Sequence, residues 1–202
     1  MFRYNTPQLM PWLMPAITWR MPQEGKSIYL TFDDGPHPEI TEWVMDELEK
    51  HNAKATFFCV GDNVRKFPET FDNLLQRGHR IGNHTHNHLN GWATDNSTYL
   101  SNIEQCDEYT NSNLFRPPYG KIGLRQFRAV RKKYRIIYWS ILSRDFEATL
   151  NVEESLAYML EHTTDGSIVL FHDSVKAEKN MKELLPRFLQ HFSQQGYSFV
   201  TL

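Results

Sequence analysis

Short apolar runs alternate with stretches of helical spacing along most of the chain. The run SIYLTF at 27–32 is rich in β-forming residues, and the stretch 38–51 repeats apolar positions at intervals of three and four. The first pattern is typical of a strand and the second of an amphipathic helix. The same alternation predicts strands at 27–32, 54–61, 79–85, 114–118, 135–142, 166–172 and 197–202, and helices at 38–51, 64–78, 96–112, 124–134, 152–162 and 177–196.

Single residues mark where several of these helices should begin, end or break. Thr41 is the expected N-cap of the first helix, and Asn96 or Ser97 of the third. Gly78 should end the second helix, because glycine accepts the left-handed backbone that follows many helices. Pro186 is expected to interrupt the last helix, since proline removes a backbone donor.

The order of these elements predicts a single α/β domain. About seven strand–helix units follow one another, an arrangement typical of a parallel sheet with crossover helices. An open doubly wound sheet and a closed barrel both fit this pattern, and in both the chemistry gathers at the carboxyl ends of the strands. The domain is expected over 27–202. An N-terminal extension, 1–26, contains prolines and tryptophans and is expected to pack on its bottom or side, with a dimer contact as the alternative.

The composition restricts the class of partner. The 202 residues are 40% hydrophobic, which is enough for one sizeable core. The net charge of −2 does not suggest a nucleic-acid or anionic-membrane partner, and no apolar run approaches the roughly 18 residues of a transmembrane helix. The N-terminus also lacks the unbroken apolar stretch of a secretion signal. The sequence as written therefore predicts a cytoplasmic monomer or weak homodimer.

Polar side chains follow five of the predicted strands at the point where each strand ends. In chain order, these are Asp33 and Asp34, then HTHNH at 84–88, RPPYG at 116–120, RDF at 144–146, and His172 with Asp173. Because the carboxyl ends of parallel strands share one edge of a sheet or one rim of a barrel, we expect these side chains to surround a single site.

The histidines at the third strand end suggest a metal site. His84 and His88 are four residues apart, so on one helical turn their imidazoles share a face and can hold one ion. In an extended segment His86 would join them instead, but Gly82 and the asparagines favour a turn after His84. Two histidines and one carboxylate leave open positions on a divalent cation, which suits zinc, cobalt, nickel or iron. Such a cation lowers the pKa of a bound water from about 15.7 toward about 7.

The adjacent acids Asp33 and Asp34 would point to opposite faces of a straight strand. Gly35 and Pro36 make a break in the strand at this point, and the break would let both acids reach one site. One acid can then bind a metal while the other accepts a proton from water. The simpler alternative is a helix-capping Asp–Gly–Pro turn.

At this point the sequence resembles the polysaccharide deacetylases, the metal-dependent carbohydrate esterases that include chitin and peptidoglycan N-acetylglucosamine deacetylases. The resemblance covers about 27–202 and rests on five motifs in order: TFDDGP (31–36), HTHNH (84–88), RPPYG (116–120), RDF (144–146) and LFH (170–172). It implies a distorted (β/α)7 barrel that removes N-acetyl groups from N-acetylated sugars, of the chitooligosaccharide or peptidoglycan type, and releases acetate. The implied cofactor is one divalent metal, Zn²⁺ before Co²⁺, Ni²⁺ or Fe²⁺.

The resemblance also implies a role for each matching position. The roles are Asp33 as general base; Asp34, His84 and His88 as metal ligands; Arg116 as the partner that orients the base; the Tyr119 backbone N–H as an oxyanion donor; His172 as general acid; Asp145 as its tuning partner; and Leu170, Phe146 and Pro118 as substrate contacts. The family often has tryptophan where this chain has Phe146, which loses the indole N–H donor. An upstream acid often seen in the same motif is Leu142 here.

Aromatic residues outside the motifs receive separate interpretations. Trp139 lies in a strand pattern and is expected in the core, whereas Trp92 lies in the loop LNGWATD and can stack on a sugar face. Two alternative functions remain at this stage. One is a related hydrolase of a small non-sugar amide or imide, since the fold does not name the substrate. The other is a non-catalytic carbohydrate-binding protein, against which the complete set of motif residues argues.

Overall fold

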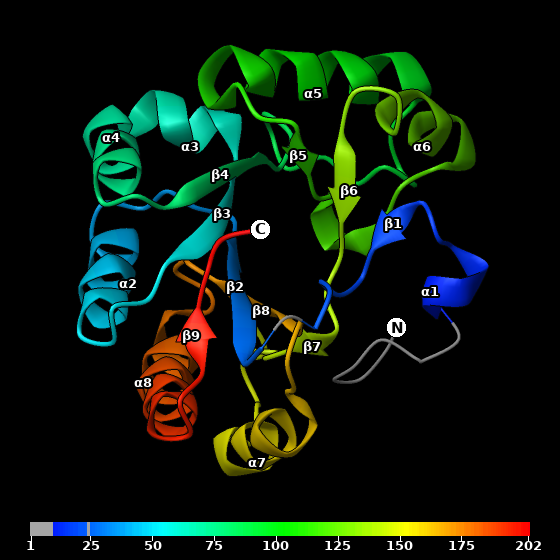
Figure 1. The fold of residues 1–202 in the computed structure, drawn as a ribbon. Helices are drawn as coiled ribbons and strands as arrows, with labels where there is room; N and C mark the ends of the chain where they lie inside the picture. Colours follow the sequence, from blue (N-terminus) through cyan, green and yellow to red (C-terminus); the bar gives the residue numbers. More distant parts are fainter. Residues whose placement is uncertain (1–9, 24) are drawn as a thin grey trace.

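The computed structural model describes residues 10–23 and 25–202, in which parallel strands curve around a common interior (Figure 1). The strands are β1 Ile17–Thr18, β2 Ser27–Asp33, β3 Ala55–Cys59, β4 Arg80–Asn83, β5 Leu114–Phe115, β6 Arg135–Ile137, β7 Ile141–Leu142, β8 Ile168–His172 and β9 Ser198–Phe199. They form the order β1-β6-β5-β4-β3-β2-β8-β7, with β9 beside β2 and every named pair parallel.

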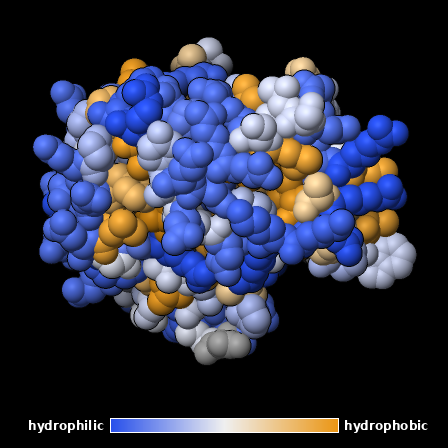
Figure 2. Space-filling model, turned by 90° about the horizontal axis from the view of Figure 1, so that it is seen from above, coloured by the Kyte–Doolittle hydropathy of each residue, from blue (hydrophilic) through white to orange (hydrophobic). Residues whose placement is uncertain are grey.

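Helices cover the outside of these strands. They are α1 Met10–Leu13, α2 Ile40–Glu49, α3 Gly61–Lys66, α4 Pro68–Gln76, α5 Asn96–Thr110, α6 Leu124–Val130, α7 Val152–His162 and α8 Glu178–Gln194, with the 3₁₀ turn η1 at Pro118–Gly120. The predicted parallel architecture is therefore confirmed, and of the two candidate forms the structure has the distorted (β/α)7 barrel, built from β2 to β8. Seen from the side of α5, the surface is mostly hydrophilic, with apolar side chains in separate patches (Figure 2).

The predicted single strand at 135–142 is wrong, because it is two strands at opposite ends of the sheet. β6 pairs with β5 and β1, whereas β7 pairs with β8. The residues between them cross from one end to the other: the Tyr138 N–H donates to Thr18 O (2.8 Å) and the Ser140 N–H donates to Ile168 O (2.9 Å). This crossing bridges the gap in the barrel, and Trp139 within it is half-buried: it packs against two core clusters and also faces the strand ends.

Several predicted helix boundaries also need correction. The helix predicted at 64–78 is two helices that meet before Pro68, since proline starts a helix more easily than it continues one. Pro186 lies inside α8 and does not end it. The N-cap of α5 is Asp95, whose side chain accepts the Thr98 N–H, and the N-cap of α2 is Glu39 and not Thr41. Gly78, with φ of 74°, follows the end of α4 as expected.

Separate clusters of apolar side chains fill the space outside and inside the barrel. Alternate residues of β2 face outward and pack against α2 and α8 in a large apolar core that includes Leu30, Phe32 and Phe188. The interior holds a smaller apolar cluster of Phe58, Leu114, Ile137, Ile168 and Leu202. Within the described residues, no helix combines the length and apolar character needed to span a membrane. The barrel thus leaves its polar strand ends as the place for chemistry.

Candidate active site

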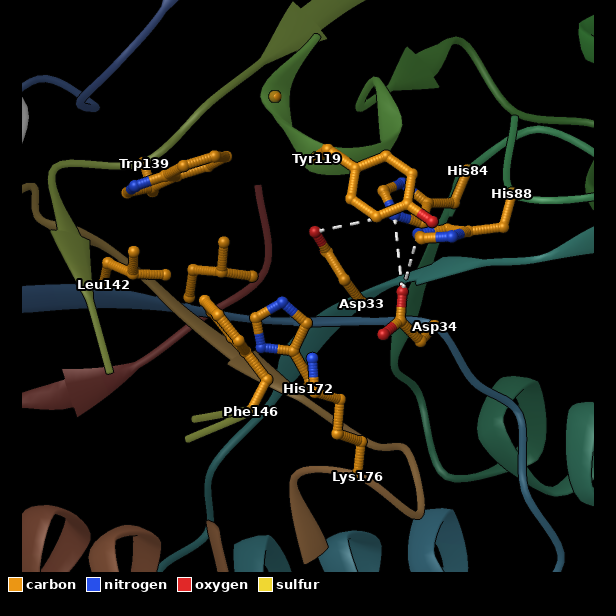
Figure 3. A pocket seen from close by; sticks show the side chains of 12 residues that line it. Asp33, Asp34, His84, His88, Tyr119, Trp139, Leu142, Phe146, His172 and Lys176 are labelled. Atoms are coloured by element: carbon orange, nitrogen blue, oxygen red, sulfur yellow. Dashed lines mark ion pairs between the residues drawn. The ribbon is translucent and has the colours of Figure 1, made fainter. Parts of the chain in front are cut away.

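A pocket of about 270 Å³ opens at the carboxyl ends of the strands (Figure 3). It is lined by Asp33, Asp34, His84, His88, Tyr119, Gly120, Trp139, Leu142, Phe146, Leu170, His172 and Lys176. All five motif regions found in the sequence contribute to the lining. The first four supply Asp33, His84, Tyr119 and Phe146, and the fifth supplies Leu170 and His172. The strand ends that the sequence placed on one rim therefore meet in one cavity.

The two adjacent acids both reach this pocket because β2 ends between them. Asp33 is the last residue of β2 and pairs with His172 of β8, and Asp34 has a left-handed backbone with φ of 85°. A non-glycine residue with positive φ is uncommon and is held by its surroundings. The Gly35–Pro36 peptide that follows is cis. The expected break in the strand is present and turns the second carboxylate toward the same side as the first.

A buried carboxylate just after β8 holds this turn in place. Asp173 Oδ1 accepts the Gly35 N–H (3.0 Å), and Asp173 Oδ2 accepts the hydroxyl of Thr41 (2.6 Å), which itself accepts the His37 N–H (2.8 Å). Burial raises the pKa of Asp173 to about 7. A Cβ on Gly35 would lie 2.0 Å from Asp173 Oδ2, so only glycine fits against this carboxylate. The local prediction of Thr41 as a helix cap missed this role, because its partner lies 132 residues away.

Asp33 is fixed by a buried arginine inside the barrel. Arg116 Nη1 donates to Asp33 Oδ1 (2.7 Å) and to Thr31 Oγ1 (2.8 Å), and its other nitrogens donate to the carbonyls of Ile137 and Tyr138. The guanidinium also lies 4.1 Å from the centre of the Phe58 ring. Both charged side chains are buried, so each supplies the counter-charge that the other needs in a dry interior. This arrangement leaves Asp33 Oδ2 directed at His84, whose Nε2 lies 3.8 Å away.

Asp34, His84 and His88 converge, with one ligand atom from each lying within 4.8 Å of the others. The His88 Nε2 atom lies 3.1 Å from Asp34 Oδ1, and the His84 Nε2 atom lies 3.6 Å from the same oxygen. The His84 Nδ1 atom is 2.7 Å from Arg116 O. A carbonyl only accepts, so Nδ1 carries the proton and Nε2 keeps its lone pair for a metal.

The protonation of these groups also suits a cation site. Burial has the largest effect on His84 and lowers its pKa to about 4, which keeps the imidazole neutral near pH 7. Burial raises the pKa of Asp34, but its hydrogen bond with His88 and the nearby imidazoles outweigh burial and hold that pKa well below its usual range. Neutral imidazoles and an ionised carboxylate are the forms that bind divalent metals. The donor set therefore fits a divalent cation.

The loop that carries the two histidines is shaped by asparagine side chains. Asn83 Oδ1 accepts the Thr85 N–H, and Asn102 Oδ1 accepts the Asn87 N–H, both at 2.9 Å. Thr85 and His88 have positive φ values of 63° and 54°, so the segment turns sharply and does not continue as a strand. His86 points away from the pocket and stacks on Tyr109, with the ring centres 5.6 Å apart.

His172 stands beside Asp33 with a carboxylate behind it. Its Nδ1 donates to Asp145 Oδ1 (2.7 Å), and its backbone N–H donates to Asp145 Oδ2 (2.8 Å). Burial lowers the pKa of His172, but the charge and hydrogen bond of Asp145, followed by the charges of Asp34 and Asp33, outweigh burial and raise it to about 9. The ring of Phe146 packs edge-on against the imidazole at 5.0 Å. His172 is therefore held as an imidazolium, and because Asp145 bonds only its Nδ1, its Nε2–H is not engaged by that carboxylate.

The structure brings most of the predicted site residues together and leaves two outside. Tyr119, Leu170 and Phe146 line the pocket, and Arg116 and Asp145 lie directly behind it. Pro118 and Trp92 are not among the lining residues. Four lining residues had received no role of their own from the sequence, namely Gly120, Trp139, Leu142 and Lys176. Lys176, in the loop after β8, lies over the Phe146 ring at 5.4 Å, and no periodic pattern marks it in the sequence.

A parallel barrel with a donor triad that fits a cation, beside a carboxylate and an imidazolium on neighbouring strands, is the arrangement expected of a hydrolase. The chain belongs to the polysaccharide deacetylase family, since the family model with that description matches residues 20–138. The family predicted from the five motifs is thus confirmed.

Individual relatives agree with this assignment. The chain is 34% identical over 194 residues to a peptidoglycan-N-acetylglucosamine deacetylase of Bacillus cereus, covering 92% of this chain and 91% of the relative. It is 37% identical over 162 residues to a chitooligosaccharide deacetylase of Azorhizobium caulinodans, covering 76% and 77%. A crystal structure of a peptidoglycan N-acetylglucosamine deacetylase bound to 4-naphthalen-1-yl-N-oxidanyl-benzamide superposes with a TM-score of 0.88 at 30% identity, covering 98% and 95%.

Proposed function

We propose that the protein is a metal-dependent N-deacetylase that removes acetyl groups from N-acetylglucosamine units of an oligo- or polysaccharide. The observation that carries the proposal is the pairing of Asp33 with His172 across β2 and β8. Asp33 is backed by Arg116 and His172 by Asp145, so one group is set to accept a proton and the other to donate one. The names of the relatives, a peptidoglycan-N-acetylglucosamine deacetylase and a chitooligosaccharide deacetylase, support an acetylated sugar as the substrate class.

The triad of Asp34, His84 and His88 would hold the cation, and zinc is our first choice because two imidazoles and one carboxylate with open positions suit it. When bound, the cation supplies Lewis acidity and lowers the pKa of a coordinated water. Cobalt, nickel and iron accept similar ligands and remain alternatives. The chain's own contribution is to place this ligand group directly beside Asp33, whose Oδ2 atom lies 3.8 Å from His84 Nε2.

Asp33 is the general base in this proposal. Arg116 occupies its Oδ1, so its Oδ2 is the atom that accepts the proton of the attacking water. The backbone N–H of Tyr119, from a residue of the 3₁₀ turn with φ of 60°, is our candidate donor to the oxyanion that develops on the acetyl carbonyl. Asp33 would thus orient the water, and the Tyr119 N–H would stabilise the negative charge on the carbonyl oxygen.

His172 is the general acid. Its Nδ1 is fixed by Asp145, so the proton at Nε2 is the one that moves to the leaving amine as acetate departs. The pKa of about 9 keeps this proton on the imidazole near neutrality. The apolar side chains of Leu170, Leu142 and Trp139 line the same pocket and suit the acetyl methyl group.

The runner-up function, hydrolysis of a small non-sugar amide or imide, would use the same residues. A panel assay separates the two. Acetate release would be measured with N-acetylglucosamine oligomers, peptidoglycan fragments, small acetamides and cyclic imides, after chelation and after zinc is returned. We expect release from the acetylated sugars that stops with chelator and recovers with zinc. Turnover of the small amides alone would overturn the proposal. The cytoplasmic location and the monomer or weak homodimer stay predictions.

A further inference from the structure

Trp92 is an exposed aromatic side chain on the same rim as the pocket. It lies in the loop between β4 and α5 and is 71% exposed. The loop between β5 and α6, which supplies Tyr119 to the pocket, lies against it. Both loops follow the carboxyl ends of neighbouring strands, so Trp92 and the pocket face the same side of the barrel.

The indole of Trp92 is held rigidly although it is exposed. Its Nε1–H donates to Ile122 O (3.1 Å), and its backbone N–H donates to Asn90 Oδ1 (3.0 Å). The Lys121 ammonium lies 5.4 Å from the ring centre. A large apolar ring fixed in solvent gains nothing from burial in the free protein. Such a ring can, however, bind a partner with little loss of side-chain entropy.

A buried glutamine locks the two loops together beneath this ring. Gln126 Nε2 donates to Gly91 O (2.9 Å) and to Thr94 O (3.0 Å), and its Oε1 accepts the Gly123 N–H (2.7 Å). Gln126 is 1% exposed, so these bonds are not exchanged with water. A Cβ on Gly91 would lie 2.6 Å from Lys121 O, which shows how closely the loops approach. The position of Trp92 relative to the pocket is therefore set by the fold.

The surface between Trp92 and the pocket is continuous along the chain. Tyr119 and Gly120 line the pocket, and Lys121 follows them and reaches the Trp92 ring. Tyr119 is 52% exposed and packs on His88 with the ring centres 4.6 Å apart. A chain of sugar units with one acetyl group in the pocket would pass over Tyr119 on its way to Trp92.

We propose that Trp92 forms a distal sugar-binding subsite, with Lys121 behind it. The C–H face of one pyranose ring would stack on the free face of the indole, while the Lys121 ammonium supports the ring from the opposite face. This proposal rests on the proposed function and deepens it, because it makes the preferred substrate an oligosaccharide long enough to reach from the pocket to Trp92.

The test compares substrates of increasing length. The value of kcat/KM for acetate release is measured for N-acetylglucosamine oligomers from dimer to hexamer. The Trp92→Ala variant should lower the hexamer-to-dimer ratio roughly three- to tenfold, in line with the energy of one aromatic contact. Trp92→Phe should restore most of the ratio. Trp12→Ala is the matched control, since Trp12 is 76% exposed on α1, and this variant should keep the wild-type ratio.

Two further measurements separate the subsite from the proposed function. Hexamer binding to Asp33→Asn, measured by calorimetry, should weaken by a similar factor when Trp92→Ala is added, whatever the turnover. Gln126→Leu should lower the ratio as well, because it removes the bonds that hold both loops. An unchanged ratio and unchanged binding in the Trp92→Ala variants would overturn the subsite and leave the deacetylase proposal intact. Absence of acetate release by the wild-type protein from every oligomer would instead overturn the proposed function.

Discussion

The acid–base pair and the metal-ligand group form two adjoining halves of one pocket and are built differently. Asp33 and His172 lie on the paired strands β2 and β8, and each has a buried partner of opposite charge. Asp34 and His88 lie on loops with left-handed backbone. Proton-transfer groups need controlled charge, which buried ion pairs supply. Metal ligands need convergence, for which strand geometry alone is insufficient because neighbouring residues of a strand point apart.

The largest expected effect comes from removing a metal ligand. Asp34→Ala or His84→Ala should lose bound metal and activity together, with turnover falling on the order of a thousandfold or more, since metal catalysis supplies several kcal/mol. Metal content by atomic spectroscopy and acetate release would be measured on the same preparations. His191→Ala, which changes a histidine of α8 outside the pocket, is the control. A variant with full metal content would show that the triad does not hold the cation.

Replacing Asp33 should separate the two halves. Asp33→Asn keeps an oxygen for Arg116 but cannot accept a proton, so turnover should fall about 10²- to 10⁴-fold while bound metal stays. Asp46→Asn, at an exposed carboxylate paired with Arg77, should change neither quantity. Full activity in Asp33→Asn would make the assignment of the base wrong, and loss of metal would mean that Asp33 belongs to the ligand group.

Replacing Asp145 should change the pH dependence rather than remove the acid. His172 has its pKa raised from 6.5 to about 9, so the charged pair stabilises the fold fully below pH 6.5 and this stabilisation is lost as pH rises through about 9. Asp145→Asn should move the alkaline limb of kcat/KM to lower pH by about one to three pH units. The measurement is kcat/KM across pH in the zinc-loaded enzyme. An alkaline limb at the wild-type position would exclude His172 as its origin.

The same contrast explains what could be predicted from the sequence. Asp33, His84, Arg116 and His172 were found because each ends or directly follows a strand that the local pattern predicts. Their supporting contacts depend on residues distant in sequence. Asp173 meets Thr41 across 132 residues, and local propensity instead assigned the threonine to a helix cap.

The prediction of a single strand through 138–140 failed for a related reason. The run 135–142 is uniformly β-forming, and only the need to bridge β6 and β7 at opposite ends of the sheet divides it. Trp139 was therefore expected in the core alone, whereas it packs against the core and also lines the pocket. Periodicity reports which face of an element is apolar, and it contains no information on where a barrel must be bridged.

The smallest expected effect tests how the loop half holds Asp34. Thr41→Val preserves shape but leaves the His37 N–H and one oxygen of the buried Asp173 without the Thr41 hydroxyl as their hydrogen-bond partner. We expect a loss of about 1–3 kcal/mol in the free energy of unfolding, measured with denaturant, because buried polar groups are left unsatisfied. Thr149→Val, at an exposed threonine before α7, should stay within about 0.5 kcal/mol of the wild type. Metal affinity and the kcat of the metal-saturated enzyme are measured on the same variant. If the affinity falls and the kcat does not, then the Thr41–Asp173 hydrogen bond supports the metal-ligand group alone. An equal fall in both would mean that the turn after Asp33 couples the two halves.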